Sequence, residues 1–574
     1  MSNYSLMLAH INDTHSNFEP SRVQFSLNEG GKTLQLQSRS GGYARLGFQI
    51  ARARKNAEAK GCEFLFLHGG DSFQGTLYFR EFQGAANAHL LNLLKPDAMV
   101  LGNHEIDAGN SPVQAFLNRV DFPVLAGNMD LSQEDSHKPG KLRDHPMLFD
   151  YQEQSRTAKV LLRPFHDRTL AIIGITLDQM KLIARPDADT HFANAIVTTA
   201  NTVRQLKADG IDHIIVLSHL GLDQDRTLAA EVDGISLIVG GHTHTLQGDF
   251  STLGLSHIPY GETVNHTPIV HAGKYAETLG LAEIRFDAQG KAVSLEGNNF
   301  FMLDTQFKLS SDAGVTRADH DAATARLRAH PGILWDDESA TLARTIAEEY
   351  RPALDALENQ VLAFIPRELV HTRLPSKNLP HGSEIAPWVS YSMYHQAKEL
   401  DARVDFALHN AGGVRQSLNQ GELTLADVVG GLLPFDLPLV KYEIQGLYLY
   451  QALESAIDGA TNNGVTGTGA GSFPYTYGLR FHYDGTRVQG QRITRLEILR
   501  EQEWHSVCHD SHYVGVSSAY TAAGKEGYQA LLSSRWQDPL ESLTLPGAFI
   551  SFVGKAGLFD EPLAPHVYYT SHRR

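Results

Sequence analysis

Residues 5–15 read SLMLAHINDTH, an apolar run that ends in two side chains with metal-ligand chemistry, Asp13 and His15. The apolar run is typical of a buried strand, and the polar residues after it are typical of a loop. The same pattern recurs in FLFLHGGDS (64–72), MVLGNHEID (99–107), IIVLSHLG (214–221) and LIVGGHTHT (237–245). These segments add the candidate ligands Asp71, Asn103, His219, His242 and His244. Seven ligand side chains overfill a single site, so the pattern predicts two adjacent divalent cations.

The same segments predict the fold class. Short apolar runs alternate with amphipathic, helix-like stretches such as residues 41–60 and 200–211. This alternation indicates an α/β layered sheet with its ligands at strand ends, where open sheets usually place their sites. Because several of the runs are apolar on both faces, we expect strands that are buried from both sides.

The chain has 574 residues, which predicts about two to four domains. Around residues 336–362 the sequence becomes charged and helix-periodic, DDESATLARTIAEEYRPALDALENQ, and Pro352 is expected to interrupt the helix. We therefore expect a first domain over residues 1–335, a helical linker over 336–362 and a second α/β domain over 363–574.

Composition excludes some partners. The net charge is −16, which disfavours nucleic-acid polymers and anionic membranes. No apolar run approaches the roughly 20 residues needed to cross a bilayer. The first residues, MSNYSLMLAHIND, carry no signal-peptide pattern, so the expected location is cytoplasmic, with a periplasmic location as the alternative if a signal peptide was removed. The two cysteines imply no disulfide framework, and we expect a monomer or a weak dimer.

The segment GNHEID contains the most specific local motif. Asn103 can ligate a cation through its amide oxygen, which leaves the adjacent His104 imidazole free for acid–base work or for stabilising charge. Asp107, three residues later, can hold that imidazole in one tautomer and favour its cationic form. Glu105 is expected to hydrogen-bond within the loop.

The order of these motifs resembles the calcineurin-like metallophosphoesterase superfamily and, within it, the 5′-nucleotidase/UDP-sugar hydrolase family. The resemblance implies a four-layer αββα metallophosphoesterase domain joined by a helix to a smaller α/β substrate-binding domain. It implies two divalent metal ions (Mn, Zn, Co or Fe), with His104 and Asp107 as the catalytic dyad. One ion would be held by Asp13, His15, Asp71 and His244, and the other by Asp71, Asn103, His219 and His242. Some family members have Gln at the position of His244.

The second half carries the segment HNAGGVR at residues 409–415. Gly412 and Gly413 would let the backbone approach a planar ligand, and the Arg415 guanidinium can bind phosphate oxygens in a forked geometry. In the resembled family this motif binds the nucleotide, so the resemblance places Asn410 at the base and Arg415 at a phosphate.

Other substrate residues follow from the same resemblance. Phe435 and Tyr520 match the two aromatic positions that sandwich the base, and aromatic faces stack on any nucleobase. Tyr520 stands where Phe is common, and Glu526 stands where Asp is usual for the ribose hydroxyls. Arg373 and Lys377 fall where the family places basic residues towards phosphate, although KNLPHGSEIAPW departs from the usual helix start.

These observations predict a two-metal phosphohydrolase acting on nucleotides, either a 5′-nucleotidase or a hydrolase of UDP-sugars and nucleoside di- or triphosphates. A 2′,3′-cyclic phosphodiesterase/3′-nucleotidase remains an alternative because of Tyr520 and Glu526. Two further alternatives are a non-enzymatic nucleotide-binding protein and a sulfur-compound hydrolase on the same scaffold. The paired aromatics favour a nucleobase over a sulfur compound.

Overall fold

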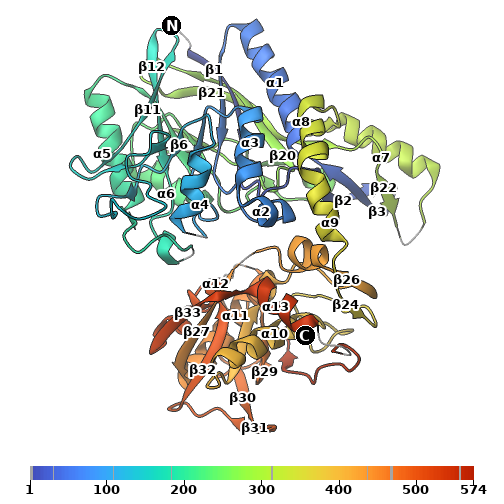
Figure 1. Ribbon diagram of the computed structural model, residues 1–574. Coiled ribbons are helices and arrows are strands. Elements are labelled where there is room, and N and C mark those ends of the chain that lie inside the picture. The colour runs from blue at the N-terminus through green and yellow to red at the C-terminus, as the bar shows by residue number, and fades with distance from the viewer. Residues whose placement is uncertain are drawn as a thin grey trace. The chain divides into compact units, whose positions relative to one another are not determined.

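A computed structural model describes residues 4–573 apart from residues 30, 108, 183, 312–313, 436, 466–468 and 555–557. The chain folds as two compact units, Met1–Pro352 and Ala353–Arg574, each with its own sheets and helices (Figure 1). The boundary falls within the segment 336–362 that the sequence marks as a connector.

The first sheet of the first unit contains the strands that precede three of the ligand segments. Strands β1 (Tyr4–Ile11), β4 (Glu63–His68), β5 (Ala98–Val100), β6 (Val124–Leu125) and β8 (Leu148–Phe149) pair in parallel in that order. The sheet continues from β1 through the antiparallel strands β20 (Thr278–Phe286), β21 (Ala292–Leu303), β3 (Lys32–Ser40) and β2 (Ser21–Glu29). Strands β22 (Lys308–Ser310) and β23 (Ile333–Trp335) pair with β3 and β21.

A second sheet in this unit carries the other two ligand segments. Its parallel strands are β12 (Arg168–Ile175), β14 (His213–Ser218), β15 (Leu237–Val239) and β19 (Thr267–Val270). Antiparallel strands β11 (Leu161–Phe165) and β18 (Glu262–Val264) form its edges. Short two-stranded ribbons pair β7 (Met129–Asp130) with β13 (His191–Phe192), β9 (Tyr151–Gln152) with β10 (Thr157–Ala158), and β16 (Gly248–Asp249) with β17 (His257–Ile258).

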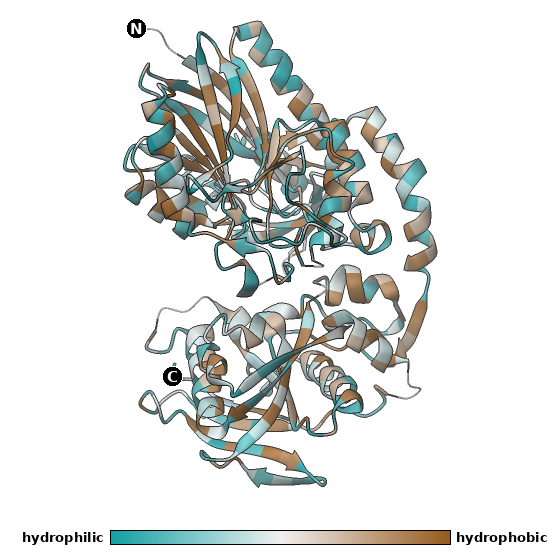
Figure 2. Cartoon of the chain, turned by 60° about the vertical axis from the view of Figure 1, so that its left-hand side comes forward, coloured by the Kyte–Doolittle hydropathy of each residue, from teal (hydrophilic) through white to brown (hydrophobic). Residues whose placement is uncertain are grey.

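The core of the first unit lies between these two sheets. Leu6, Leu65 and Val100 from the first sheet share one buried cluster with Ile172 and Ile215 from the second. Helix α1 (Tyr43–Lys60) covers the first sheet at β1 and β4, and α5 (Ala195–Ala208) covers β12 of the second. The strands are mostly apolar and the outer helix faces mostly polar (Figure 2). The predicted αββα layering is therefore confirmed.

The remaining helices of the first unit are shorter. They are α2 (Leu77–Phe82), α3 (Ala85–Leu94), α4 (Asn110–Leu117), α6 (Leu222–Glu231) and α7 (Arg317–Ala329).

The prediction that Pro352 interrupts the connecting helix is wrong. Helix α8 (Ala340–Thr345) continues through a π-helical turn, Ile346–Tyr350, into α9 (Arg351–Glu358). Proline lacks an N–H and its ring clashes with the carbonyl of the preceding turn of an α-helix. A wider turn directly before Pro352 accommodates the ring, so the helix continues through the proline.

The second unit is an α/β domain with a mixed sheet in the order β28 (Pro474–Tyr477), β25 (Phe406–Asn410), β32 (His512–Ser518), β27 (Pro438–Gln445) and β33 (Trp536–Thr544). Its helices include α10 (Ala386–Leu400), α11 (Gly446–Thr461), α12 (Ala519–Ala522) and α13 (Leu545–Val553). A second sheet runs β31 (Glu503–Ser506), β30 (Ile493–Arg500), β29 (Leu479–Asp484) and β34 (Val567–Thr570), and β24 (Val361–Ile365) pairs with β26 (Gly421–Thr424).

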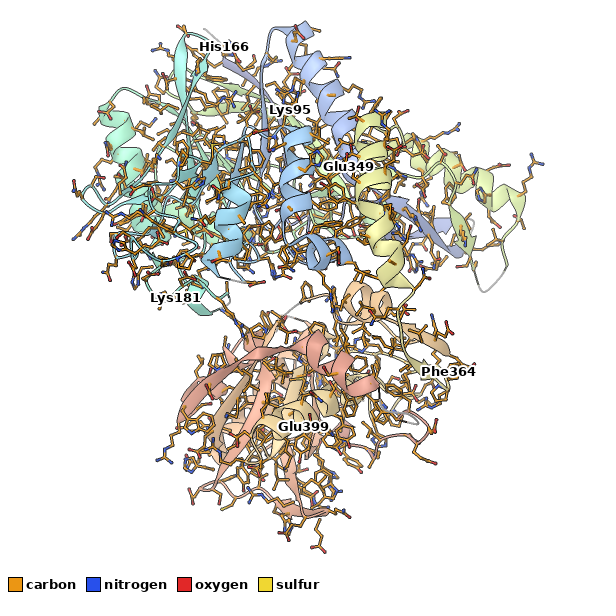
Figure 3. The ribbon with its side chains drawn as sticks, in the orientation of Figure 1. Lys95, His166, Lys181, Glu349, Phe364 and Glu399 are labelled. Atoms are coloured by element: carbon orange, nitrogen blue, oxygen red, sulfur yellow. The ribbon has the colours of Figure 1, made fainter. Side chains whose placement is uncertain are left out.

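Exposed side chains mark the surface of this unit. Figure 3 labels Phe364 on β24 and Glu399 near the end of α10, and both are exposed. None of the helices in the described part of the chain is both long and apolar enough to cross a bilayer.

Candidate metal centre

All seven predicted ligands lie in loops at the carboxyl ends of parallel strands of the first unit. Asp13 and His15 follow β1, Asp71 follows β4, Asn103 follows β5, His219 follows β14, and His242 and His244 follow β15. The β1 and β4 loops are joined by backbone hydrogen bonds, from Asp13 N to Gly70 O at 2.8 Å and from His15 N to Asp71 O at 3.0 Å. The sheet topology therefore brings together residues that are more than 200 positions apart in the sequence.

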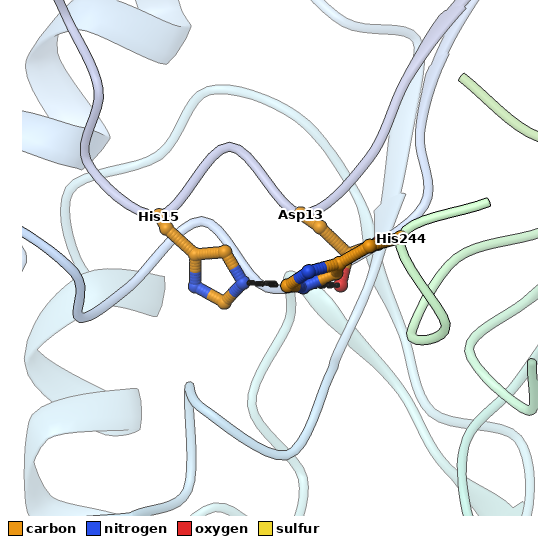
Figure 4. Close-up of side chains that lie close together, drawn as sticks. All are labelled: Asp13, His15 and His244. Carbon is orange, nitrogen blue, oxygen red and sulfur yellow. Dashed lines mark hydrogen bonds and ion pairs between the residues drawn. The ribbon is translucent and has the colours of Figure 1, made fainter. Parts of the chain in front are cut away.

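A first group of ligands consists of Asp13, His15 and His244, whose ligand atoms lie within 4.8 Å of one another (Figure 4). The Nε2 atoms of His15 and His244 are 3.1 Å apart, and the Asp13 Oδ1 atom is 3.4 Å from His244 Nε2. His15 Nδ1 faces the Phe73 carbonyl oxygen at 3.1 Å, so the ring directs Nε2 into the group. Three ligand atoms of the types that transition metals prefer converge on one point.

A second group consists of Asp71, His219 and His242. His219 Nδ1 donates to the Gly69 carbonyl oxygen at 2.6 Å, which turns Nε2 towards Asp71 Oδ2 at 3.1 Å. Such a hydrogen bond on the second ring nitrogen is typical of metal-ligating histidines. The two groups adjoin, because the backbone N–H of His242 donates to Asp13 Oδ2 at 2.9 Å.

Buried ligand atoms without hydrogen-bond partners test whether these residues fit a cation. Asn103 Oδ1 is buried and has no hydrogen-bond partner among the described residues, and the buried atoms Asp13 Oδ1 and His219 Nε2 contact only other predicted ligands, without hydrogen-bond geometry. Burying an unpaired polar atom is costly, so such atoms in a folded protein call for an unseen ligand. An oxygen–nitrogen donor set with these atoms aimed inward fits divalent metal ions.

The protonation states of the first-group residues favour cation binding. Burial raises the pKa of the Asp13 carboxyl, but the His244 and His219 imidazoles outweigh burial and lower it to about 2. Burial and the neighbouring His104 and His244 rings lower the pKa of His15 to about 3. At neutral pH Asp13 is therefore a carboxylate and His15 carries a free lone pair, as metal ligation requires.

The backbone at the site is strained. Five of the seven ligands have left-handed φ angles: Asp13 51°, His15 47°, Asp71 56°, His242 77° and His244 55°. For residues other than glycine such angles cost on the order of 1–3 kcal/mol each, and they persist where the surrounding structure enforces them. The sharp turns direct successive polar side chains at one point instead of onto opposite faces of a strand.

Two buried side chains hold these loops in place. The Glu105 carboxylate accepts from the backbone N–H groups of Asp71, Ser72, Phe73 and Gly102, at 2.6–3.0 Å. The Asn12 amide donates to Asp13 Oδ2 at 2.7 Å and to the Gly273 carbonyl oxygen at 2.8 Å. Glu105 thus bonds within its own loop, as expected, only to Gly102, and its other bonds reach the loop after β4. Nothing in the local spacing pointed to Asn12.

The predicted dyad is formed at the edge of the two groups. His104 Nδ1 lies 2.6 Å from Asp107 Oδ2, and the His104 ring is also close to His15 and Asp71. Burial lowers the pKa of His104, but the Asp107 and Asp71 carboxylates outweigh burial and raise it to about 10. His104 is therefore an imidazolium at neutral pH and can donate a hydrogen bond to an anion.

The predicted substrate residues lie together in the second unit. Asn410 Nδ2 donates to Glu526 Oε2 at 3.3 Å, and the Arg415 guanidinium carbon lies 5.9 Å from the centre of the Phe435 ring. The Tyr520 hydroxyl lies beside the Glu526 carboxylate. Burial and this carboxylate together raise the pKa of Tyr520. We call these five residues the nucleotide cluster.

The basic residues upstream behave differently from each other. Arg373 lies close enough to Glu526 to lower the pKa of that carboxyl, although burial outweighs this effect and the pKa is raised overall. Lys377 is exposed, and no hydrogen bond or ion pair with a described residue ties it to the nucleotide cluster. The glycine pair is also asymmetric, because a Cβ atom at Gly413 would lie 2.2 Å from Nε2 of the buried His409. Packing against His409 therefore requires a glycine at 413.

Both units match known protein families. Residues 6–246 match the family described as Calcineurin-like phosphoesterase, and residues 375–533 match the family described as 5′-nucleotidase, C-terminal domain. A probable 5′-nucleotidase of Treponema pallidum is 31% identical over 554 residues, which cover 92% of this chain and 88% of that protein.

The chain belongs to the 5′-nucleotidase family. The NAD 5′-nucleotidase of Haemophilus influenzae is 28% identical over 99% of this chain and 93% of its own length. The crystal structure of a 5′-nucleotidase precursor from Thermus thermophilus superposes with a TM-score of 0.70 at 26% identity and covers 98% of this chain and 99% of its own. The resemblance stated from the sequence is thus confirmed, together with the two-domain fold and metal-dependent phosphoester hydrolysis as the family's chemistry.

One segment beside this 5′-nucleotidase metal centre was not singled out from the sequence. The Tyr275 backbone N–H donates to the Asp13 carbonyl oxygen at 2.7 Å, and the Tyr275 ring lies 5.6 Å from the His244 ring and 5.7 Å from the His15 ring. The preceding residue, Lys274, places its ammonium 4.4 Å from the centre of the Tyr275 ring. The segment GKYAE carries no ligand pattern, so only the fold reveals that it borders the ligands.

Proposed function

We propose that this protein is a two-metal phosphohydrolase of nucleotides with 5′-nucleotidase activity. The observation that carries the proposal is the pair of adjoining ligand groups, one around Asp13 and one around Asp71, whose buried carboxylate and imidazole atoms face one another. Asp71 clusters with His15 and His104 and also with His219 and His242, which suits a carboxylate that bridges two cations.

The chemistry divides between the cations and the side chains. Two divalent cations, when bound, supply Lewis-acid stabilisation of the phosphoryl group and lower the pKa of the attacking water. Asp13, His15, Asp71 and His244 would hold one of them, and Asp71, Asn103, His219 and His242 the other. His104, charged and oriented by Asp107, donates a hydrogen bond to the phosphoryl oxygens or the leaving group as negative charge develops there.

The nucleotide cluster supports the choice of substrate. Phe435 and Tyr520 offer aromatic faces for a base, and Arg415 offers a guanidinium for a phosphate. The relatives named above are a probable 5′-nucleotidase and an NAD 5′-nucleotidase, names that point to the same ligand class.

Two measurements on purified protein test the proposal. Elemental analysis is expected to give two equivalents of Mn, Zn, Co or Fe per chain, and a substrate panel is expected to release phosphate fastest from nucleoside 5′-monophosphates. Faster hydrolysis of 2′,3′-cyclic nucleotides or 3′-monophosphates would instead support the alternative that Glu526 keeps open, because its side chain is one methylene longer than the usual Asp. Release from none of these substrates after metal loading would refute the proposal.

A further inference from the structure

A cavity of about 430 Å³ in the first unit has the predicted metal ligand His244 in its lining. Small-molecule sites commonly have volumes of about 300–1,000 Å³. Every residue of its lining lies within residues 22–301, so the cavity is formed by the first unit alone and uses no residue of the nucleotide cluster. It is also not one of the ligand groups, since only His244 belongs to both.

The cavity wall is fixed to the metal loops by the backbone. The N–H of Gly273 donates to the Thr245 carbonyl oxygen at 2.9 Å, and Leu246 pairs with Ala272 as an isolated antiparallel bridge. Gly273, Thr245 and Leu246 all line the cavity. The wall is therefore held in register with His244, as a substrate-positioning surface needs to be.

The charged lining suits a phosphorylated ligand. Arg22 and Lys274 both line the cavity, and Arg22 forms no ion pair with any described residue. A guanidinium and an ammonium are the two groups with which proteins usually bind phosphate.

The rest of the lining suits a sugar ring. Glu277 lines the cavity, and its carboxyl makes no hydrogen bond or ion pair with a described residue, so it can accept from hydroxyl groups. Burial raises the pKa of this carboxyl to about 7, although Lys274 opposes the shift. Leu246, Leu255 and Ile258 give the cavity an apolar wall against which a ring can pack.

We propose that this cavity is a subsite for a phosphorylated sugar attached to the far side of the scissile phosphate, as in a pyrophosphate-linked dinucleotide. A phosphate held at the ligand groups carries its second substituent next to them, and His244 belongs both to the first ligand group and to the lining of the cavity. The inference deepens the proposed nucleotide hydrolysis and depends on it. In the reaction water adds its oxygen to the nucleoside-side phosphorus, the bridging P–O bond breaks, and its electron pair leaves with the second phosphate. Two monophosphates result, and the protons of the water pass to them or to solvent.

The test compares NAD with AMP as substrates of the metal-loaded full-length protein. The readout is the ratio of kcat/KM for NAD to kcat/KM for AMP, since AMP has no group to place in the cavity. Leu255→Trp fills the cavity and is expected to lower this ratio about tenfold or more. Arg22→Gln removes an exposed cation without touching the core and is expected to lower the ratio about threefold.

Matched controls lie elsewhere in the same unit. Leu162→Trp on β11, where the leucine is 52% exposed, and Arg52→Gln on α1 are expected to leave the ratio as in the wild type. A ratio unchanged in both Leu255→Trp and Arg22→Gln would overturn the subsite, as would a wild type that cleaves AMP but not NAD. A wild type that releases no phosphate from AMP would be a different result, which refutes the proposed function itself and the subsite with it. If Leu255→Trp does not fold, Arg22→Gln and its control decide the question.

Discussion

The metal centre of the first unit and the nucleotide cluster of the second are built in contrasting ways. The metal ligands extend from parallel strands, are mostly buried, and sit in strained turns tied together by Glu105 and Asn12. The nucleotide cluster comes from the end of strand β25, two loops, the short helix α12 and the turn after it, its members are mostly half-buried, and the hydrogen bond between Asn410 and Glu526 is long at 3.3 Å.

This difference fits the roles proposed for the two regions. Cations need fixed ligand positions, so backbone strain and buried hydrogen bonds are used to hold them. A base is bound through stacking, which tolerates small displacements and different ring types. We therefore expect changes in the first region to affect chemistry strongly and changes in the second to affect mainly binding.

The largest effect is expected from Asp71→Ala, because Asp71 is the carboxylate proposed to bridge the two cations. Losing several kcal/mol of transition-state stabilisation should lower kcat/KM by about 10³–10⁴-fold, with a parallel loss of bound metal. Steady-state kinetics and elemental analysis measure both. The control Asp121→Ala removes an exposed carboxylate in the same unit and should behave as wild type. Retained activity in Asp71→Ala would contradict the bridging role.

His104→Ala is expected to separate chemistry from metal binding. The loss of the positioned imidazolium should lower kcat by about 10²–10⁴-fold while the metal content stays unchanged. The comparison variant is His137→Ala, since the His137 side chain is 92% exposed. A variant with nearly full kcat would remove His104 from the chemistry.

Glu105→Gln tests whether the loop hydrogen bonds preorganise the ligands. An amide oxygen accepts less strongly than a carboxylate and its NH₂ group faces backbone N–H groups, so metal affinity should fall by about 10–100-fold. Calorimetric titration of the metal-free protein measures the affinity, and saturating metal should restore most of kcat. Glu58→Gln on the exposed side of α1 is the control. Unaltered affinity would show that the strained turns hold their shape without Glu105.

A smaller effect is expected from Tyr520→Ala in the nucleotide cluster. Losing one stacking face costs about 1–3 kcal/mol, so KM for AMP should rise by about 5–150-fold with little change in kcat. Phe364→Ala, at a ring that is 65% exposed on β24, provides the control for aromatic removal in this unit. A fall in kcat at unchanged KM would mean that Tyr520 acts in the chemistry, and the contrast between the two regions would not hold.

The smallest effect concerns pH. Burial raises the pKa of Glu526 above 4.5, although Asn410 and Arg373 oppose this shift. Only the carboxylate accepts a hydrogen bond from a ribose hydroxyl, so KM should rise as pH falls towards the raised pKa of Glu526. This rise in KM should begin at a higher pH than it would for a glutamate with an ordinary pKa. One hydrogen bond of about 0.5–1.5 kcal/mol predicts a change of about two- to tenfold. Profiles of KM against pH for wild type and Glu526→Gln measure it, and the variant should lack this component.

Much of the first unit was predictable because each ligand directly follows an apolar strand. A strand pattern fixes where the chain leaves the sheet, and parallel strands end at one edge, so Asp13, Asp71 and Asn103 could be placed together without coordinates. The prediction failed at Pro352, because a π-helical turn directly before the proline lets the helix continue. The prediction was incomplete at Gly413, because a glycine is required there by packing against a buried histidine.

By itself the sequence determined the ligand chemistry, the two-domain α/β architecture and the family, because these depend on residue types at short range and on their order. Only the tertiary structure decided that Asn12 holds Asp13, that Tyr275 packs against two ligand rings, and that Arg22, Glu277 and His244 line one cavity. The physical reason is that the partner of a side chain depends on how the backbone turns and on which distant segments, some 200 residues or more apart, pack beside it. A cavity is likewise a void between such segments. Neither leaves a local pattern in the chain.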